Sequence, residues 1–512
     1  MSQYDQYGDD IHLVHGERTW TWRESDTYAR RIANALLDLG VRKGDRVLIV
    51  LPNCPDIVFC RMACIKIGAI SVGLNPRCTL REMEHNLTDS GAEVAIVDAN
   101  AMAKLIDIRA HERTNLKRII VVGQTPDGGG AYPHLELESI AAAASEEEPE
   151  VDISPDDVLL LSYTGGTTGV SKGCCYTNRM LEWHARAWAQ WFAPQLNGER
   201  PRLLVSLPMY HAYAITCSVL LPIVSGGTAI IGHSPRVDDV LADINGYEPN
   251  LWPSIPAWVM PVSELSDTTH SGLSNVAITL CGTCPVSEDA LRKFNEVTDS
   301  LMIEGYGLSE ATSAVSFSPM GWQKLNSVGV PIFDTQVLTV DVETGEHLTE
   351  LNEPGEIIIR GPQVITAYWN NLQATENTIR NGWLYTGDIG CIDEDGFLHI
   401  TGRKKEMFIV GGFNVFPREI DHVIEEHPDV FQSCTVSVPH RRLGEVAFSF
   451  VVPRPDADID GDTLDAYCRE RLVAYKAPKG FHILSEMPLT AVNKPDVLAL
   501  KSLAAELYQS GE

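Results

Sequence analysis

The chain contains the segment Tyr163-Thr164-Gly165-Gly166-Thr167-Thr168-Gly169-Val170-Ser171-Lys172-Gly173, which follows an apolar run from Val158 to Leu161. The run predicts a buried strand that ends in a loop. Glycines let the backbone turn tightly and bring its N–H groups close to a ligand, and threonine hydroxyls and a lysine ammonium donate hydrogen bonds to phosphate oxygens. We therefore interpret the segment as a polyphosphate-binding loop. The alternative from composition alone is a flexible Gly/Thr loop without a ligand.

The order of residues in this loop excludes a phosphate loop of the Walker A type. That motif requires Gly-Lys-Ser/Thr, whereas Lys172 follows Ser171 and precedes Gly173. A kinase or ATPase built on the Walker A loop is therefore excluded as a class of function.

The segment closely resembles the signature of the AMP-forming acyl-CoA synthetases and their adenylating relatives, Tyr-Thr-Ser-Gly-Thr-Thr-Gly-x-Pro-Lys-Gly. It departs at two positions, where Gly165 replaces the usual serine and Ser171 replaces the usual proline. The first change removes a hydroxyl near the triphosphate, and the second is expected to loosen the loop just before the lysine. The resemblance implies that Thr167 takes part in catalysis and that ATP contacts the other loop residues, Thr164, Gly165, Gly166, Thr168, Gly169 and Lys172.

Length and composition describe a large, acidic, globular protein. The 512 residues exceed one ordinary hydrophobic core and predict at least two domains. The formal net charge of −29 disfavours nucleic acids and anionic membranes as partners, so an ATP site must gather its cations locally. The N-terminus lacks a signal-peptide pattern, and the apolar stretch 215–232 is interrupted by Pro222. We therefore expect a cytoplasmic protein without a membrane span.

The twelve cysteines are irregularly spaced and do not predict a disulfide framework. Cys281 and Cys284 form a lone CxxC without a second pair or a histidine partner. Buried, reduced thiols are favoured over a zinc or redox site.

Strand-like apolar runs and helical patterns alternate near the N-terminus, in the order 46–51, 56–67, 69–74, 80–90 and 92–97. This alternation predicts an α/β fold with mostly parallel sheets. The resembling family has the same order. It implies a large N-terminal adenylating domain, residues 1–403, and a small mobile α+β lid domain, residues 404–512.

His211 lies in a segment whose counterpart in the family, Pro-x-x-His-x-x-Gly, lines the acyl pocket. The resemblance implies that His211 gates this pocket and belongs with the catalytic residues, whereas the alternative is a core histidine bonded to a backbone carbonyl. Ala214 replaces the usual glycine, which narrows the pocket by a methyl group. No carboxylate lies between Ser206 and Leu221, and an α-amino acid is disfavoured because its ammonium group would lack a partner.

Two glycine-containing motifs match segments that surround the nucleotide in the family. The first follows a predicted strand, 276–280, and its counterpart lies beside the adenine and the acyl group. Its residues here are Gly282, Thr283 and Cys284.

The second motif runs from Glu304 to Glu310. Tyr306 can stack on adenine, Ser309 can donate to the α-phosphate, and Glu310 is a hard oxygen ligand suited to Mg²⁺. The flanking glycines, Gly305 and Gly307, let the backbone approach a flat ligand. Without the phosphate loop this segment would read as a turn with a surface glutamate.

Three C-terminal motifs complete the resemblance. Asp388, in Thr-Gly-Asp, takes the role of accepting hydrogen bonds from the ribose hydroxyls, with an ordinary turn as the alternative. Arg403 reaches the ribose and phosphate, and Lys405 takes the place of the hinge. Gly411 and Gly412 form a turn whose counterpart meets the pantetheine arm of coenzyme A.

Lys494 matches the mobile catalytic lysine of the family, although Asn493 replaces the usual glycine and no arginine follows before Lys501. A lone lysine in such a loop is usually a solvated surface charge.

These motifs lead to the prediction of an acid–CoA ligase. It activates a fatty, branched or aromatic monocarboxylate with ATP and Mg²⁺ and transfers the acyl group to coenzyme A. One alternative keeps the adenylation but transfers to a carrier protein or another acceptor, and another is a catalytically silent nucleotide-binding protein. A homodimer is left open, because the oligomeric state cannot be read from the sequence.

Overall fold

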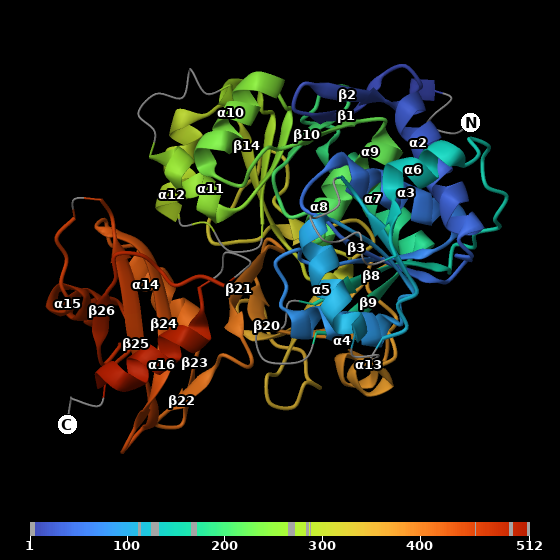
Figure 1. The fold of residues 1–512 in the computed structure, drawn as a ribbon. Coiled ribbons are helices and arrows are strands. Elements are labelled where there is room, and N and C mark those ends of the chain that lie inside the picture. Colours follow the sequence, from blue (N-terminus) through green and yellow to red (C-terminus); the bar gives the residue numbers. More distant parts are fainter. Residues whose placement is uncertain are drawn as a thin grey trace.

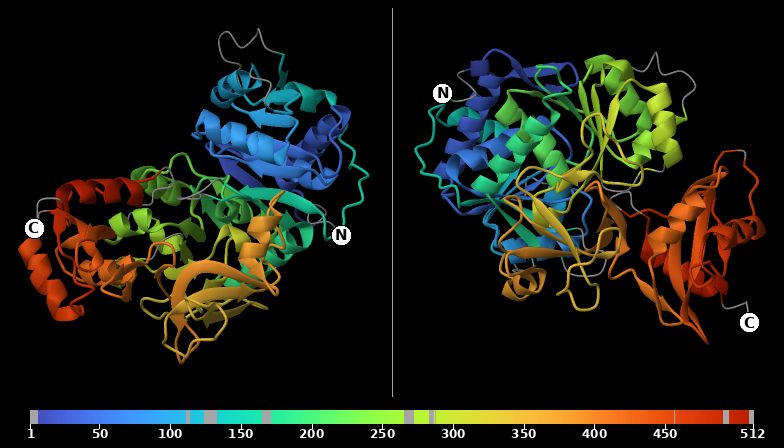
Figure 2. Two further views of the ribbon diagram at one scale, coloured as in Figure 1. Left: turned by 90° about the horizontal axis from the view of Figure 1, so that it is seen from below. Right: turned by 180° about the vertical axis from the view of Figure 1, so that it is seen from behind.

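The structure is a computed structural model that describes residues 6–110, 114–123, 133–164, 171–264, 272–282, 286, 288–455, 457–490 and 495–508. It consists of a large body and a small C-terminal domain, coloured orange to red in Figure 1. Figure 2 shows from below and from behind that the small domain lies beside the large body.

Two mostly parallel sheets form the large body. The first runs in the spatial order β7 (Leu135–Glu136), β6 (Arg118–Val121), β5 (Val94–Val97), β3 (Arg46–Val50), β4 (Ile70–Gly73), β8 (Val158–Tyr163) and β9 (Gly173–Thr177). The second runs β16 (Val330–Pro331), β15 (Ser316–Phe317), β14 (Leu301–Tyr306), β13 (Ile278–Cys281), β12 (Leu251–Ser254), β10 (Arg202–Val205), β11 (Thr228–Ile231), β1 (Ile11–His15) and β2 (Arg18–Thr21). Central strands of this kind are buried on both faces, which explains their continuous apolar runs. The predicted α/β class is confirmed.

Helices pack between and around the two sheets. They are α2 (Trp22–Asp38), α3 (Pro55–Ile67), α4 (Leu80–Ser90), α5 (Ala99–Ala110), α6 (Leu137–Ala143), α7 (Asn178–Phe192), α8 (Ala212–Ile215), α9 (Leu221–Ser225), α10 (Val237–Tyr247), α11 (Pro256–Ser263), α12 (Glu288–Val297) and α13 (Leu372–Thr378). One hydrophobic core joins α3 and α7 to strands of both sheets, including β3 and β10. The sheets are thus fixed relative to each other by shared burial of apolar side chains.

The ends of α4 follow from its sequence. Thr79 and Glu82 form a capping box in which each side chain accepts a hydrogen bond from the other residue's backbone N–H. Gly91 ends the helix in the left-handed conformation with a φ of 64°, which glycine adopts without strain. These local signals fix the two ends of α4, and the Asp89 side chain in its last turn contacts Tyr163 at the end of β8.

The apolar stretch 215–232 is divided among α8, a π-helical turn at Thr216–Leu220, α9 and β11. No helix in the described ranges is long and apolar enough to cross a membrane.

A third sheet, which the sequence analysis did not predict, connects the large body to the small domain. It is antiparallel and contains β17 (Gln336–Val340), β18 (Gly355–Arg360), β20 (Trp383–Ile392), β19 (Ile379–Arg380) and β21 (Leu398–Arg403). Its apolar residues form a separate small core. Figure 1 shows β20 and β21 at the side of the large body that faces the small domain.

The small domain has its own sheet and its own hydrophobic core. Its elements are β22 (Phe408–Val410), β23 (Phe413–Val415), α14 (Pro417–Glu425), β24 (Val430–His440), β25 (Gly444–Pro453), α15 (Gly461–Arg471), β26 (Phe481–Ile483) and α16 (Val497–Tyr508). Helices packed on a mixed sheet agree with the predicted α+β class.

Phe450 has an exposed fraction of 0% in this core. We expect Phe450→Ala to lower the free energy of unfolding of the small domain by about 3–5 kcal/mol, because it removes apolar contacts and leaves a cavity. Leu498→Ala is the control, since Leu498 in α16 is 62% exposed and its truncation should cost less than about 0.5 kcal/mol. Hydrogen exchange of the small domain's amides measures both, and equal losses would contradict the assignment of this core.

Candidate functional site

The phosphate-loop segment begins at the end of β8 and returns in β9. We call Tyr163, Thr164, Ser171, Lys172 and Gly173 the loop neck; Gly165, Gly166, Thr167, Thr168 and Gly169 lie outside the described residues. The Thr164 N–H donates to the Lys172 carbonyl at 3.0 Å. The Ser171 hydroxyl donates to the Thr164 carbonyl at 2.7 Å, a bond that the usual proline could not form. The two sides of the neck are therefore joined directly.

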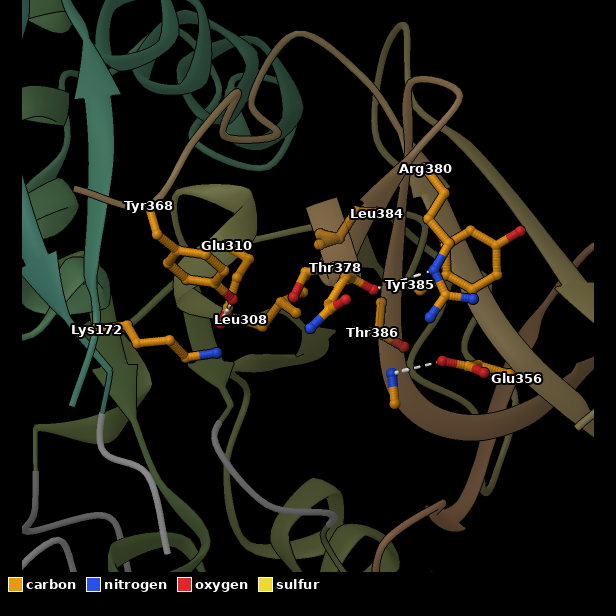
Figure 3. Close-up of a pocket in the computed structure, with 12 residues that line it drawn as sticks. Lys172, Leu308, Glu310, Glu356, Tyr368, Thr378, Arg380, Leu384, Tyr385 and Thr386 are labelled. Carbon is orange, nitrogen blue, oxygen red and sulfur yellow. Dashed lines mark hydrogen bonds between the residues drawn. The ribbon is translucent and has the colours of Figure 1, made fainter. Parts of the chain in front are cut away.

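Lys172 and Glu310 line one cavity of about 220 Å³, and Tyr368 connects them. The Lys172 ammonium lies over the Tyr368 ring, 4.3 Å from its centroid, and the Tyr368 hydroxyl donates to Glu310 Oε1 at 2.6 Å. Burial and the neighbouring Glu310 carboxylate raise the pKa of Tyr368 well above its ordinary value. Figure 3 shows these three side chains on one side of the cavity. A cation and a hard oxygen ligand thus face the same space.

The remaining wall of the cavity comes from the third sheet and its neighbours (Figure 3), and its residues are Leu308, Glu356, Asn377, Thr378, Arg380, Leu384, Tyr385, Thr386 and Gly387. The sequence analysis missed Tyr368 and most of this wall, although Leu308, Thr386 and Gly387 lie in motifs that it named. Tyr368 lies in a segment without periodicity, and its hydrogen bond joins residues 58 positions apart. No local pattern could have indicated it.

Tyr306, Asp388 and Arg403 form a second group. Asp388 on β20 pairs in register with Arg403 on β21, and Arg403 Nε lies 3.0 Å from Asp388 Oδ1. The Tyr306 hydroxyl donates to Asp388 Oδ2 at 2.6 Å. Burial, followed by the charge of Asp388, raises the pKa of Tyr306 well above its ordinary value. The structure therefore brings together three residues that the sequence analysis assigned to the nucleotide.

The turn after β14 approaches the neck closely. The Tyr176 hydroxyl on β9 donates to the Ser309 carbonyl at 2.6 Å, which ties this turn to the strand that follows Lys172. A Cβ atom at Gly307 would lie 1.4 Å from the Ser313 carbonyl oxygen, and one at Gly305 would lie 2.6 Å from the Phe317 ring. Both glycines are therefore required by close backbone packing within the protein.

His211 and Tyr213 lie at the start of α8. The His211 ring is half-buried and packs against Tyr210 with 4.3 Å between centroids, so it does not belong to the core. The Tyr213 hydroxyl donates to the Leu280 carbonyl at 2.7 Å, and its ring would lie 3.6 Å from a Cβ at Gly282. These residues bring α8 to the end of β13. Thr283 and Cys284 lie outside the described residues.

The predicted lid residues occupy exposed turns. Lys405 is exposed in the turn between β21 and β22. Gly411 and Gly412 connect β22 to β23 with φ values of 58° and 91°, and the Gly411 N–H donates to the Leu443 carbonyl at 2.9 Å. Lys494 lies outside the described residues.

The residue just before Lys405 is anchored to the large body. The Lys404 N–H donates to the Gly387 carbonyl at 2.8 Å. Its ammonium lies 2.8 Å from Glu356 Oε2, and the Glu356 side chain is only 7% exposed. The chain is therefore held firmly up to position 404.

Glu304, in β14, carries a carboxyl group whose pKa is raised. Its Oε1 accepts a hydrogen bond from the Val286 N–H at 3.3 Å. Burial raises the pKa of Glu304 to about 7, and the Arg418 guanidinium of the small domain acts in the opposite direction.

In the described part of the chain, no group of three His, Cys, Asp or Glu side chains could hold a metal ion. Cys281 of the CxxC pattern is buried.

Comparisons with known proteins extend over nearly the whole chain. The profile of the AMP-binding enzyme family matches residues 2–369, and that of the AMP-binding enzyme C-terminal domain matches residues 419–494. The chain is 33% identical over 501 residues to the long-chain-fatty-acid–CoA ligase of Bacillus subtilis (strain 168), covering 93% of this chain and 88% of the relative. It is 33% identical over 482 residues to the feruloyl-CoA synthase of Amycolatopsis sp., covering 94% and 93%. The solved structure of O-succinylbenzoate coenzyme A synthetase from Bacillus subtilis in complex with ATP and magnesium ion is similar with a TM-score of 0.82 at 26% identity, covering 98% of each chain.

The raised pKa of Glu304 predicts a pH-dependent stability. Between its ordinary value of 4.5 and about pH 7, the folded protein keeps a proton that the unfolded chain releases. Stability therefore falls as the pH rises through this window, and the burial penalty is fully present above pH 7. Glu304→Gln keeps the acceptor for Val286 and removes the charge. We expect it to raise the Tm at pH 8 but not at pH 5, and the same shift at both pH values would contradict this account.

Proposed function

Because the chain belongs to the AMP-binding enzymes, the adenylate-forming superfamily, we propose that the cavity between Lys172, Glu310 and Tyr368 holds the phosphates of ATP. The family matches confirm the family resemblance that the sequence analysis found in the phosphate-loop segment. The chain is an AMP-forming acid–CoA ligase, which uses ATP with Mg²⁺ and coenzyme A as a substrate. The observation that carries the proposal is the connection of the Lys172 cation to the Glu310 carboxylate through the Tyr368 hydroxyl.

The reaction has two steps. A carboxylate is a poor electrophile, because its charge is delocalised over two oxygens. In the first step a carboxylate oxygen bonds to the α-phosphorus of ATP, the bond to the β-phosphate oxygen breaks, and pyrophosphate leaves. In the second step the thiol sulfur of coenzyme A bonds to the acyl carbon, AMP leaves, and the thiol proton passes to solvent. The protein must therefore bind phosphate charge first and admit a thiol afterwards.

In the first step, the residues proposed to lie at the phosphates supply positive charge and hydrogen bonds. Lys172 neutralises charge at the triphosphate and keeps its ammonium over the Tyr368 ring. Lys494 supplies a second cation by its match to the family's mobile lysine, and Thr167 adds a hydroxyl from the loop. Such preorganised charges stabilise the charge that develops on the phosphorus oxygens. The Tyr368 hydroxyl holds the Glu310 carboxylate in place.

The residues at Glu310 fit a magnesium ion bound together with ATP. Mg²⁺ usually takes one or two protein carboxylates plus substrate phosphates rather than a cage of protein ligands. Glu310 offers such a carboxylate on the cavity wall, and the described residues contain no three-ligand protein cage. When bound, the ion stabilises negative charge on the phosphate oxygens.

Asp388 is proposed to bind the ribose, with Tyr306 beside the adenine. Arg403 and Tyr306 each occupy one oxygen of the Asp388 carboxylate. An ionised carboxylate accepts about four hydrogen bonds, so it retains capacity for the two ribose hydroxyls. The same bonds orient the Tyr306 ring, which supports its stacking role.

The acid is proposed to be a monocarboxylate with an apolar chain or an aromatic ring. Two relatives are named for long-chain fatty acids and for a feruloyl group, which supports this class. His211 and Tyr213 place aromatic rings at the start of α8, and the Tyr213 ring lies close to Gly282. We assign these three residues to the wall of the acyl pocket.

The small domain is proposed to rotate between the two steps about the turn that follows Lys404. Lys404 is anchored to Gly387 and Glu356 of the large body, while Phe408 begins the first strand of the small domain. The backbone change then falls on the exposed turn that contains Lys405. The turn at Gly411 and Gly412, on the same domain as Lys494, is assigned to the pantetheine arm.

A panel of acids tests the function directly. Medium- and long-chain fatty acids, branched acids and cinnamic acids are incubated with ATP and Mg²⁺, with and without coenzyme A, and AMP and pyrophosphate are measured. We expect pyrophosphate from a matching acid, and AMP release that depends on coenzyme A. AMP release without coenzyme A dependence would favour another acceptor, and the absence of pyrophosphate with every acid would contradict the proposal.

The hinge is tested by Lys405→Pro with Lys405→Ala as its control. Proline fixes φ near −65° and restricts the residue before it, so the pivot loses freedom. We expect the proline variant to release pyrophosphate in a first turnover and to lose thioester formation at least about tenfold, while the alanine variant stays close to the wild type. Equal loss of both half-reactions in the proline variant would place the pivot elsewhere.

A further inference from the structure

One face of α4 contacts both sides of the loop neck. His85 and Asp89 are four residues apart and therefore lie on the same face of the helix. His85 Nε2 donates to the Ser171 carbonyl at 2.9 Å, on the returning side of the neck. The Tyr163 hydroxyl, on the outgoing side, donates to Asp89 Oδ2 at 2.6 Å. The helix therefore holds the points where the chain enters and leaves the phosphate loop.

The bond between Tyr163 and Asp89 has the character of a strong interaction. A short hydrogen bond to an ionised carboxylate is roughly twice as strong as one between neutral groups. Burial, and then the bond to Asp89, raises the pKa of Tyr163 above its ordinary value, so the phenol keeps its proton for donation.

Asp89 also holds the segment that carries Tyr368. Its backbone carbonyl accepts a hydrogen bond from Trp369 Nε1 at 3.1 Å and another from Asn370 Nδ2 at 3.1 Å. Tyr368, the preceding residue, contacts both Lys172 and Glu310. Asp89 therefore makes two connections. Its carboxylate binds Tyr163 of the loop neck, and its backbone carbonyl binds the residue next to Tyr368, which lies between Lys172 and Glu310.

The space between these parts is closely packed. The backbone N–H of Trp369 donates to the Gly173 carbonyl at 2.7 Å. A Cβ atom at Gly173 would lie 3.2 Å from the Tyr163 ring and 3.3 Å from Trp369 Cβ. A shift of Tyr163 would therefore be transmitted to Trp369 and to its neighbour Tyr368, because packed side chains leave little free volume.

We propose that Asp89 is a positioning residue for ATP binding and adenylation, which sets the separation of Lys172 and Glu310 through Tyr163 and Trp369. The inference rests on the proposed function, because it assigns the phosphates of ATP to the space between Lys172 and Glu310. Asp89 itself is not among the residues that line the cavity. It acts by fixing the neck and the Tyr368 segment as one unit.

A double-mutant cycle on the full-length protein tests this role. The variants are Asp89→Ala, Tyr163→Phe and the two combined, with Asp89→Asn as the conservative variant and Arg81→Ala, at an exposed position of the same helix, as the control. The measurements are direct titration of ATP with Mg²⁺, acid-dependent exchange of ATP and pyrophosphate, and thioester formation from a preformed acyl adenylate and coenzyme A.

We expect Asp89→Ala and Tyr163→Phe each to weaken ATP binding and slow the exchange by about tenfold. The double variant should bind ATP no more weakly, and exchange no more slowly, than the more impaired of the two single variants, since both substitutions remove the same bond. Asp89→Asn should restore part of the loss, because its amide oxygen still accepts from Tyr163 but carries no charge. Thioester formation from the preformed adenylate should stay within about twofold of the wild type.

Tyr163→Phe keeps the ring, so it is the variant that decides the matter if Asp89→Ala fails to fold. Unchanged ATP binding in Tyr163→Phe, additive effects in the double variant, or an equal fall of both half-reactions would overturn the proposal. Wild-type protein that binds ATP but shows no exchange with any acid would contradict the proposed function, and the ATP titrations would still decide the role of Asp89.

Discussion

The site depends on the interactions of Tyr368, because its side chain lies between the Lys172 ammonium and the Glu310 carboxylate, and both groups must remain available to a ligand. A direct ion pair between Lys172 and Glu310 would neutralise both groups and close the cavity. Tyr368 instead offers its ring face to the ammonium and its hydroxyl to the carboxylate, interactions that use only part of each group's capacity. In a chain with a net charge of −29, this arrangement leaves the Lys172 ammonium on the wall of the cavity, where we propose that the phosphates bind.

The parts that meet at this point belong to different layers of the fold. Lys172 precedes the antiparallel strand β9 at the edge of the first sheet, and Glu310 follows β14 of the second. Tyr368 lies in the connection from β18 of the third sheet to α13. The hydrogen bond from Tyr176 to the Ser309 carbonyl and the bonds from Trp369 and Asn370 to Asp89 join these layers beside the cavity. The hydrophobic core between the two large sheets fixes the distances at which such polar contacts form.

The connection to the small domain shows a contrast between anchored and exposed backbone. Arg403 and Lys404 are paired with the buried carboxylates of Asp388 and Glu356, whereas the turn that follows is exposed. A second contact between the domains joins Arg454 to Glu264, which also pairs with Lys293 at 3.0 Å. Exposed ion pairs of this kind contribute little free energy, so they can hold one arrangement of the domains without preventing another.

The sequence by itself determined the elements and the class of chemistry, because both depend on neighbouring residues. Apolar runs and their alternation with helical patterns predicted β8, α4 and the strands near the N-terminus, and the Gly/Thr loop with Lys172 predicted a phosphate site. Only the tertiary structure revealed the third sheet and the contacts of Tyr368, Glu356 and Asp89. The bond from Trp369 to Asp89 joins residues 280 positions apart, and hydrophobic periodicity reports how a residue is buried within its own element but not which distant segment packs against it. The residues that hold the site together were therefore decided by packing between layers, which a linear pattern does not encode.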